Sequence, residues 1–337
     1  MKISNVKSYV VDLDVEPEKR WKQIIDDHKQ FFPRVEQEID NILKNVGILG
    51  GVSKGIVSLF SSSGNVMYKR ELKGISELSG VPMNKLILMQ ICYEMFSACT
   101  SVVVRGKTQN YHFRTMDWEM DFLRDLTVNV TFMKNGKELY KSATWAGYVG
   151  VVTGVNENYS IALNYRRSKG TLLGNVMRTI KMKWPIGYMV RYIFEQNMSV
   201  NDAYEAMTSY KLISPCYITF CQSRGEGKVL VRDHDKLVAE RSLSEHGYLI
   251  QTNHDTAESE ANIMWSFERY KKAKSILESY NFSNGICDNV NTENILKNFL
   301  VRPIINPHTI YASVIVPNKF DLKSFVCKKS NSINKSI

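Results

Sequence analysis

Cys99 is the residue whose type and position best fit a catalytic nucleophile. It lies in the stretch Ala98-Cys99-Thr100-Ser101-Val102-Val103-Val104, after an apolar run from Leu86 to Phe96 that is typical of a helix. The β-branched residues that follow Cys99 are typical of a buried strand. A thiol at a helix-to-strand junction can act as a nucleophile, but a buried free cysteine can also be a small core residue. This stretch alone leaves both interpretations open.

A cysteine nucleophile needs a base, and the sequence offers two kinds. Asn253-His254-Asp255 would supply a histidine and an asparagine, as in papain-type enzymes. In those enzymes the cysteine begins a helix, whereas Cys99 begins a predicted strand. The alternative is that the chain is cut directly before Cys99 and that the freed α-amine accepts the thiol proton. An α-amine has a pKa of about 7.7–8.0, so it can do this near neutral pH without a histidine.

Other motifs in the chain fail on their context. Gly51-Val52-Ser53-Lys54-Gly55 has the spacing of a serine-hydrolase elbow, but no strand is predicted before it. The stretch from Gly50 to Gly55 is not a P-loop, because Ile56 and Val57 stand where the lysine and the hydroxyl residue would be needed. The histidines show no His-x-x-x-His spacing and the cysteines no Cys-x-x-Cys spacing. We therefore predict no metal and no cofactor.

Composition and charge narrow the class of protein. The chain has 337 residues, 44% of them hydrophobic, and a net charge of +10. Its basic residues are spread out and are not interleaved with aromatic residues, so we predict no nucleic-acid partner. Attraction to an anionic membrane surface explains the positive charge better than nucleic-acid binding does. No run reaches the ~18 apolar residues of a membrane span, and residues 1–7 lack the apolar core of a signal peptide. We thus expect a soluble protein without a visible export signal.

The elements around Cys99 predict one α+β unit with helices on the outer faces of its sheets. A polar tail is expected from Lys328 onward, and Pro33 should kink or divide the first helix. Strands are predicted at 8–15, 102–105, 110–116, 126–134, 137–144, 148–155, 159–164, 217–222, 228–233, 248–253 and 310–316. Helices are predicted at 18–43, 71–79, 171–183, 186–196, 200–210, 268–280 and 292–299. A further helix is predicted to end near Cys99.

A series of motifs, in order along nearly the whole chain, resembles one family. The motifs are Val11-Asp12-Leu13-Asp14, Lys19-Arg20-Trp21, Ala98-Cys99-Thr100-Ser101-Val102-Val103, His112-Phe113-Arg114-Thr115-Met116-Asp117-Trp118, Leu126-Thr127-Val128-Asn129, Ala146-Gly147-Tyr148-Val149-Gly150, Leu163-Asn164-Tyr165-Arg166, Gln251-Thr252-Asn253-His254-Asp255 and Thr309-Ile310-Tyr311-Ala312. Together they resemble the acid ceramidase and N-acylethanolamine-hydrolysing acid amidase family. That family belongs to the cholylglycine-hydrolase branch of the N-terminal nucleophile hydrolases.

The resemblance implies a fold and a reaction. The fold would be a four-layer αββα sandwich. The precursor, one structural unit, would cleave itself between Ala98 and Cys99, giving a helical α subunit of residues 1–98, removed or retained after the cut, and a β subunit of residues 99–337 with the catalytic core. The substrate would be an N-acylated lipid, a ceramide or an N-acylethanolamine, hydrolysed to a fatty acid and an amine. A lipid-transfer activator and a lysosomal location also belong to the family pattern.

The resemblance also implies roles for individual residues. Cys99 would attack the amide carbonyl, and Asp117 would orient its α-ammonium group. Arg114 would fix that carboxylate or contact the substrate, although an ordinary ion pair on a hairpin is the simpler reading of the two residues. Asn253 would donate to the oxyanion. Arg269 stands in Glu268-Arg269-Tyr270 where the family has an Arg-Arg pair, so one arginine is missing.

Substrate contacts are implied for Trp145, Tyr148, Asn164 and Tyr165. The family usually has Asn-Glu-Arg where this chain has Asn164-Tyr165-Arg166, so slower self-cleavage or a different pH dependence is expected. The apolar segments 47–60 and 184–188 would line an acyl channel, touch a membrane or pack in the core. Two alternatives remain open, a bile-salt or penicillin amidase-like enzyme and a lipid-binding homologue without activity.

Overall fold

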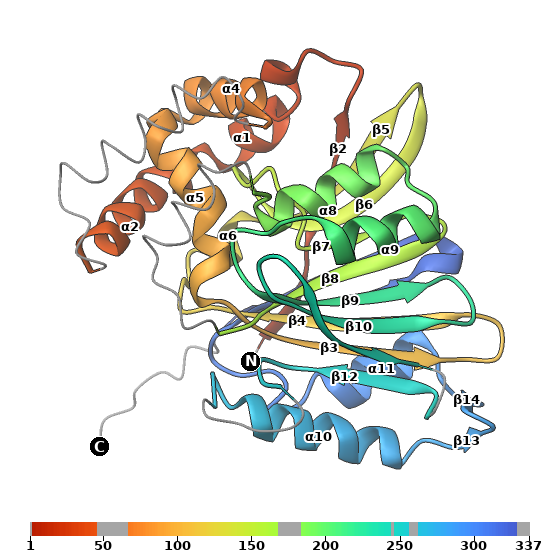
Figure 1. Ribbon diagram of the computed structural model, residues 1–337. Coiled ribbons are helices and arrows are strands. Elements are labelled where there is room, and N and C mark those ends of the chain that lie inside the picture. Colours follow the sequence, from red (N-terminus) through yellow and green to blue (C-terminus); the bar gives the residue numbers. More distant parts are fainter. Residues whose placement is uncertain (1, 46–66, 168–182, 244–245, 256–261, 329–337) are drawn as a thin grey trace, which may run out of the picture.

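Two β-sheets stacked face to face form the centre of the molecule in a computed structural model, and helices cover both outer faces (Figure 1). The structure describes residues 2–45, 67–167, 183–243, 246–255 and 262–328. The six-stranded sheet has the order β1-β16-β15-β4-β3-β12, and the eight-stranded sheet has the order β11-β10-β9-β8-β7-β6-β5-β2. This is the expected four-layer αββα sandwich.

The helices and strands have the following bounds. The helices are α1 (Lys22–His28), α2 (Phe32–Asn45), α4 (Lys69–Ser79), α5 (Met83–Phe96), α6 (Leu123–Leu126), α8 (Ile186–Glu195), α9 (Val200–Ser209), α10 (Ser266–Glu278) and α11 (Thr292–Phe299). The strands are β1 (Lys2–Asn5), β2 (Lys7–Asp12), β3 (Ala98–Arg105), β4 (Asn110–Asp117), β5 (Thr127–Lys134), β6 (Lys137–Trp145), β7 (Thr153–Val155), β8 (Tyr159–Tyr165), β9 (Cys216–Gln222), β10 (Gly227–Arg232), β11 (Leu237–Ser242), β12 (Tyr248–Gln251), β13 (Phe282–Ser283), β14 (Ile286–Cys287), β15 (Thr309–Val316) and β16 (Asp321–Lys328).

Successive side chains of β3 point to opposite faces of the sheet, so this strand packs against a helix on one face and against the second sheet on the other. Val102 and Val104 join a core cluster with Ala273 and Leu277 of α10, on the outer side of the sheet. Cys99 and the other odd-numbered residues of β3 point the opposite way, toward the second sheet, because successive side chains of a strand alternate between its faces. A strand that is buried on both faces reads as a continuous apolar run, as this one does.

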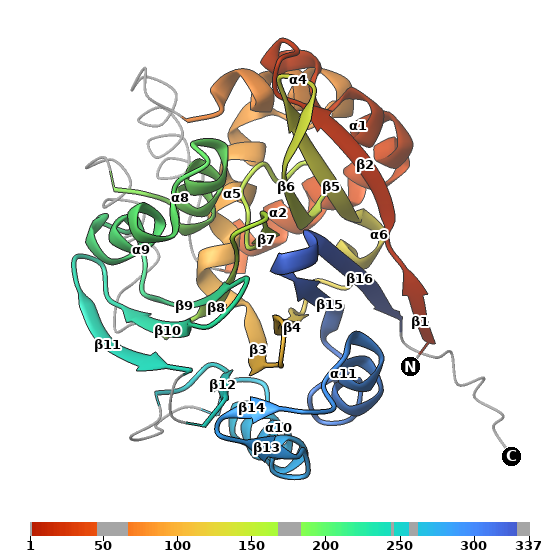
Figure 2. The ribbon, with the colours of Figure 1, turned by 90° about the vertical axis from the view of Figure 1, so that its right-hand side faces the viewer.

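The part of the chain before Cys99 is woven into both sheets. β1 pairs antiparallel with β16 in one sheet, and β2 pairs parallel with β5 in the other (Figure 2). Helices α1, α4 and α5 then pack against the eight-stranded sheet, with Trp21 and Leu72 among the residues of its core cluster. This arrangement packs the segments 2–45 and 67–98 against residues that follow Cys99.

A buried charge cluster ties the same two parts of the chain together. Glu71 of α4 accepts hydrogen bonds from Arg191 of α8 at 2.6 and 2.8 Å, from Arg20 at 2.8 Å and from Trp21 Nε1 at 2.6 Å. Arg191 is fully buried, lies 3.9 Å from the ring centroid of Tyr68 and also pairs with Glu195. Every charge in this cluster has an opposite charge next to it, which is the condition for burying it.

Several predicted elements differ from the structure. The predicted helix at 18–43 is divided next to Pro33, as expected: two α-helices are joined by a 3-10 turn, and Pro33 lies in the first turn of the second one. The strand at 148–155 is limited to 153–155, since Val151 N–H bonds to Gly187 O instead of a neighbouring strand. β1, β11 and β16 were not predicted.

Other sequence predictions agree with the structure or lie beyond its described part. Asn135 and Gly136 both have positive φ, 52° and 72°, as the predicted hairpin turn between β5 and β6 requires. The predicted helix at 171–183 except for its last residue, the segment 47–60 with Gly51-x-Ser53-x-Gly55, and residues 329–337 of the predicted tail lie outside the described residues. Lys328, where the tail was expected to begin, is the last residue of β16. Within the described residues, no helix has the length and apolar character needed to span a membrane.

Candidate active site

The β3–β4 hairpin places Cys99 and Arg114 on one buried face between the two sheets. Cys99 lies opposite Met116, and Ser101 lies opposite Arg114. Arg114 Nη2 donates to Cys99 Sγ at 3.2 Å, and Arg114 Nη1 donates to Leu163 O of β8. Cys99 and Arg114 are both fully buried. A guanidinium this close to a sulfur stabilises the thiolate form, which is the nucleophilic form of cysteine.

Asn253 holds the backbone nitrogen of Cys99 from the other side. Its Oδ1 accepts from Cys99 N at 2.8 Å and from Arg269 Nη2 at 2.9 Å. Its Nδ2 donates to the carbonyl oxygen of Tyr165 at 2.8 Å. A side-chain amide nitrogen carries two hydrogens, and this bond uses one of them. Asn253 therefore lies where it can orient the nitrogen of Cys99 and also donate to an oxyanion.

Arg269 reaches the same point from the first turn of α10. Its Nη1 donates to Cys99 O at 2.5 Å and to Thr100 Oγ1 at 2.8 Å. The carbonyls of Ile263 and Met264 accept its remaining N–H groups. This guanidinium is fully buried and is fixed by five acceptors, so it is a rigid part of the site.

Asp117 is a fully buried carboxylate at the end of β4, directly opposite Ala98 in the ladder. Thr309 Oγ1 donates to its Oδ1 at 2.6 Å, and its Oδ2 lies 3.7 Å from Arg269 Nη1. Burial raises the pKa of Asp117, although the positive charge of Arg269 and the bond from Thr309 act in the other direction. The carboxylate thus lies next to the Ala98–Cys99 bond with its charge only partly compensated.

The structure corrects one expected contact. Arg114 reaches the sulfur of Cys99, whereas the guanidinium that faces Asp117 is that of Arg269. His254 is not placed as a papain-type base either, because its Nδ1 bonds to the hydroxyl groups of Ser266 at 2.7 Å and Thr252 at 3.1 Å. Cys99, Arg114, Asp117, Asn253 and Arg269 nevertheless lie together in the structure.

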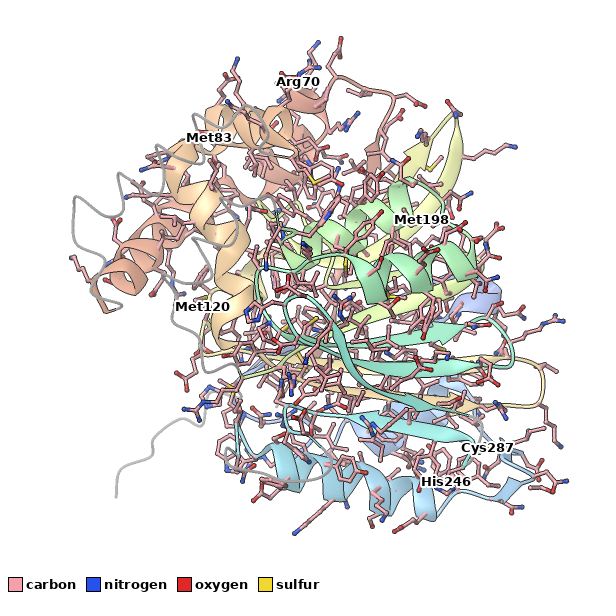
Figure 3. All side chains as sticks on the ribbon, viewed as in Figure 1. Arg70, Met83, Met120, Met198, His246 and Cys287 are labelled. Carbon is pink, nitrogen blue, oxygen red and sulfur yellow. The ribbon has the colours of Figure 1, made fainter. Side chains whose placement is uncertain are left out.

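The residues predicted to contact substrate fall into two groups. Trp145 and Tyr148 are in edge contact at 5.6 Å between ring centroids and line an apolar cavity of about 30 Å³. Met120, labelled in Figure 3, is another lining residue, and Val35, Ile39 and Met89 close the cavity from helices α2 and α5. Trp118, directly after Asp117, also lines it. The cavity therefore joins residues before Cys99 to the edge of the catalytic cluster.

Asn164 and Tyr165, at the end of β8, form the second group. Asn164 Nδ2 donates to Gln251 O at 2.9 Å, to Thr252 O at 3.1 Å and to Cys99 O at 3.4 Å. Asn164 thus ties the ends of β3 and β12, which are neighbours in one sheet, to β8 of the other sheet. The side chain of Tyr165 is half-buried, and its carbonyl orients Asn253.

Sequence reasoning missed Thr309, Thr100 and Ser266 as partners of the site. Thr309 begins β15 and donates to Asp117. It stood in a recognised motif, Thr309-Ile310-Tyr311-Ala312, so its presence was visible but its role was not. In the described ranges of the chain, no group of His, Cys, Asp and Glu residues could hold a metal ion.

Comparisons with known proteins give two matching families and several relatives. Residues 4–62 match the family described as the beta subunit of N-acylethanolamine-hydrolyzing acid amidase. Residues 99–237 match the family described as linear amide C–N hydrolases, choloylglycine hydrolase family. An uncharacterized protein of Acanthamoeba polyphaga mimivirus is 35% identical over 313 residues, which cover 90% of this chain and 94% of that protein.

Two further matches are to named proteins and also extend over most of this chain. Human acid ceramidase is 28% identical, with 94% of this chain and 85% of that protein covered. The solved structure of the Caenorhabditis elegans N-acylethanolamine-hydrolyzing acid amidase ortholog matches with a TM-score of 0.58 and 25% identity, and covers 68% of this chain and 100% of that one. The fold and the site define an N-terminal nucleophile hydrolase. Within that class, this chain belongs to the acid ceramidase and N-acylethanolamine-hydrolysing acid amidase family of amide C–N hydrolases.

Proposed function

We propose that this chain cuts itself before Cys99 and then hydrolyses the amide bond of an N-acylated lipid, a ceramide or an N-acylethanolamine. The observation that carries the proposal is that two side chains contact Cys99, one at its sulfur and one at its backbone nitrogen. Arg114 lies 3.2 Å from its sulfur, and Asn253 Oδ1 lies 2.8 Å from the nitrogen that the cut would free. A nucleophile and its own amine, both already oriented, are what this type of catalysis needs.

The self-cleavage follows from the neighbours of the Ala98–Cys99 bond. Cys99 Sγ would attack the carbonyl carbon of Ala98, the C–N bond would break, and a thioester with a free α-amine would form. Water would then hydrolyse the thioester, leaving a carboxylate on Ala98 and a thiol on Cys99. The products would be an α subunit of residues 1–98 and a β subunit of residues 99–337. Asp117, opposite Ala98 in the ladder, would hold the new α-ammonium group.

Amide hydrolysis would use the same groups in two stages. The thiol proton would move to the α-amine as Sγ attacks the acyl carbon. The second hydrogen of Asn253 Nδ2 would bind the oxyanion, and the α-ammonium would protonate the leaving amine as the C–N bond breaks. Water, deprotonated by the α-amine, would release the fatty acid from the thioester. Loss of a single oxyanion donor typically lowers kcat by about 10²–10³-fold.

The lining of the apolar cavity matches a lipid acyl group in its chemistry, although at about 30 Å³ the cavity holds no more than one or two waters until its walls move apart. Its lining of Trp145, Tyr148, Met89, Met120 and Ile39 offers aromatic and flexible apolar surface beside the catalytic cluster. The net charge of +10 would favour the approach to anionic lipid surfaces, with or without a lipid-transfer activator.

The test compares the wild-type protein with Cys99→Ala. Denaturing gel electrophoresis should show two bands of about 11 and 27 kDa for the wild type and a single band for the variant. The larger fragment should begin with Cys99 by mass spectrometry. Fatty acid should be released from ceramide or N-palmitoylethanolamine between pH 4 and 8 by the wild type only.

The opposite results would point elsewhere. An uncut wild-type chain that releases no fatty acid at any of these pH values would contradict the proposal and favour a lipid-binding homologue. Hydrolysis of a bile salt or penicillin amide, with no release from the two lipids, would identify another branch of the same superfamily. Activity that survives in Cys99→Ala would remove the nucleophile assignment.

A further inference from the structure

Ser266 is the meeting point of the two segments that hold Cys99 in place. It is the first residue of α10 and is fully buried. Its Oγ accepts from the backbone N–H of Asn253 at 2.8 Å, donates to Thr252 Oγ1 at 2.9 Å and lies 2.7 Å from His254 Nδ1. A hydroxyl group has one donor and two acceptor positions, so these three contacts use its full capacity.

His254 completes this network from the loop that follows β12. Its Nδ1 also lies 3.1 Å from Thr252 Oγ1, and its ring packs against those of Phe267 and Tyr270 at 4.3 and 5.5 Å between centroids. Burial, followed by the charges of Arg269 and Arg241, lowers the pKa of His254, while Asp255 acts in the other direction. Because Ser266 Oγ gives its only hydrogen to Thr252 Oγ1, a neutral imidazole with its proton on Nδ1 donates to Ser266 Oγ.

The network joins two catalytic residues that come from different elements. Asn253 stands between Thr252 and His254, and Arg269 follows Ser266 by one turn of α10. Both side chains converge on Cys99, at its nitrogen and at its carbonyl oxygen. A shift of the loop against α10 would therefore move Asn253 and Arg269 relative to each other.

We infer that Ser266 and His254 are positioning residues, which lock the Thr252–His254 loop to the start of α10 and thereby hold Asn253 and Arg269 on Cys99. This inference rests on the proposed function for its effect on turnover. The role requires the polar atom at Nδ1 and not the ring of His254. That distinction separates it from simple packing, because the two properties can be removed one at a time.

A pair of substitutions at His254 tests this separation. His254→Phe keeps an aromatic ring against Phe267 and Tyr270 but removes Nδ1, whereas His254→Asn keeps a polar atom near the position of Nδ1 and removes the ring. We expect His254→Phe to lower kcat for N-palmitoylethanolamine by roughly 10- to 100-fold with little change in KM, since small misplacements of catalytic groups have effects of this size. His254→Asn should retain most of kcat.

Two substitutions in α10 extend the test. Ser266→Ala should lower kcat at least as much as His254→Phe. Ser275→Ala, which changes the same residue type at an exposed position of α10, is the matched control. If His254→Phe keeps kcat while His254→Asn loses it, ring packing and not the hydrogen bond matters, and the inference is wrong. It is also wrong if all of the variants keep kcat.

A second readout needs no lipid substrate. The rate at which iodoacetamide labels Cys99 should rise in Ser266→Ala and His254→Phe, because the loosened loop exposes a thiol that is otherwise fully buried. The rate should stay near that of the wild type in His254→Asn and Ser275→Ala. Equal rates in all the proteins would overturn the inference. If the rates change as expected but the wild type hydrolyses no lipid amide, the positioning role stands and the proposed function fails.

Discussion

Replacement of Glu71 by leucine should destabilise the protein far more than any change at its sequence neighbour Arg70. Glu71 accepts four hydrogen bonds, two of them from Arg191, and both residues are at most 1% exposed. The substitution leaves Arg191 buried with only Glu195 as a carboxylate partner. Removal of one member of a buried pair typically costs about 3–5 kcal/mol, because the remaining charge has lost its compensation.

The measurement is the free energy of unfolding in urea, made in the Cys99→Ala background so that every sample is one intact chain. Arg70→Ala is the matched control, since Arg70 points outward from α4 (Figure 3) and pairs with Glu18 at the surface. Exposed pairs of this kind contribute little to stability, so the control should unfold close to the parent. The reasoning is refuted if Glu71→Leu and Arg70→Ala shift the unfolding transition equally.

Three further predictions concern pH, thiols and the cavity. Burial alone would raise the pKa of Glu71, but the charge of Arg191 and the hydrogen bonds outweigh it and lower the pKa below 4.5. The stability that depends on Glu71 should therefore be constant from pH 7 to about 4.5 and be lost only at lower pH, which urea unfolding at several pH values will measure. Burial raises the pKa of Cys221 and Cys327 to about 12. Iodoacetamide at pH 8 should leave both unlabelled in the folded protein, and peptide mass spectrometry showing rapid labelling would contradict this. Val35→Leu adds a methylene group to the wall of the cavity, so the ratio of kcat/KM for palmitoyl over shorter acyl amides should fall, and an unchanged ratio would place the acyl chain elsewhere.

Much of the hairpin around Cys99 could be predicted because its pattern is local. β4 exceeds its predicted bounds by one residue, and β3 ends where predicted but begins four residues earlier, at Ala98. Buried strands of this type carry their own signal, since both faces are apolar. By contrast, β16 contains polar residues such as Lys323 and Ser324 among its apolar ones, so its sequence pattern indicates a strand less clearly.

The partner of Asp117 shows a second limit of predicting this site from the sequence. Arg114 and Asp117 are three residues apart on β4, and an odd spacing on a strand puts two side chains on opposite faces. The sequence thus contained a reason to separate them, and the structure shows Arg114 at the sulfur and Arg269 near the carboxylate. That Arg269 and Asn253 meet at Cys99 could not be derived from spacing, because α10 and β12 are brought there by the packing of the whole fold.

The strands β1 and β2 change the thermodynamics of this protein if the chain is cut before Cys99. In the intact precursor, unfolding is a unimolecular event, and the chain can refold at any dilution. After the cut, the same event releases two fragments, each of which lacks strands of both sheets. Refolding then becomes a second-order reaction that slows with dilution, and stability depends on concentration. A processed molecule would consequently persist through slow unfolding and not through repeated refolding.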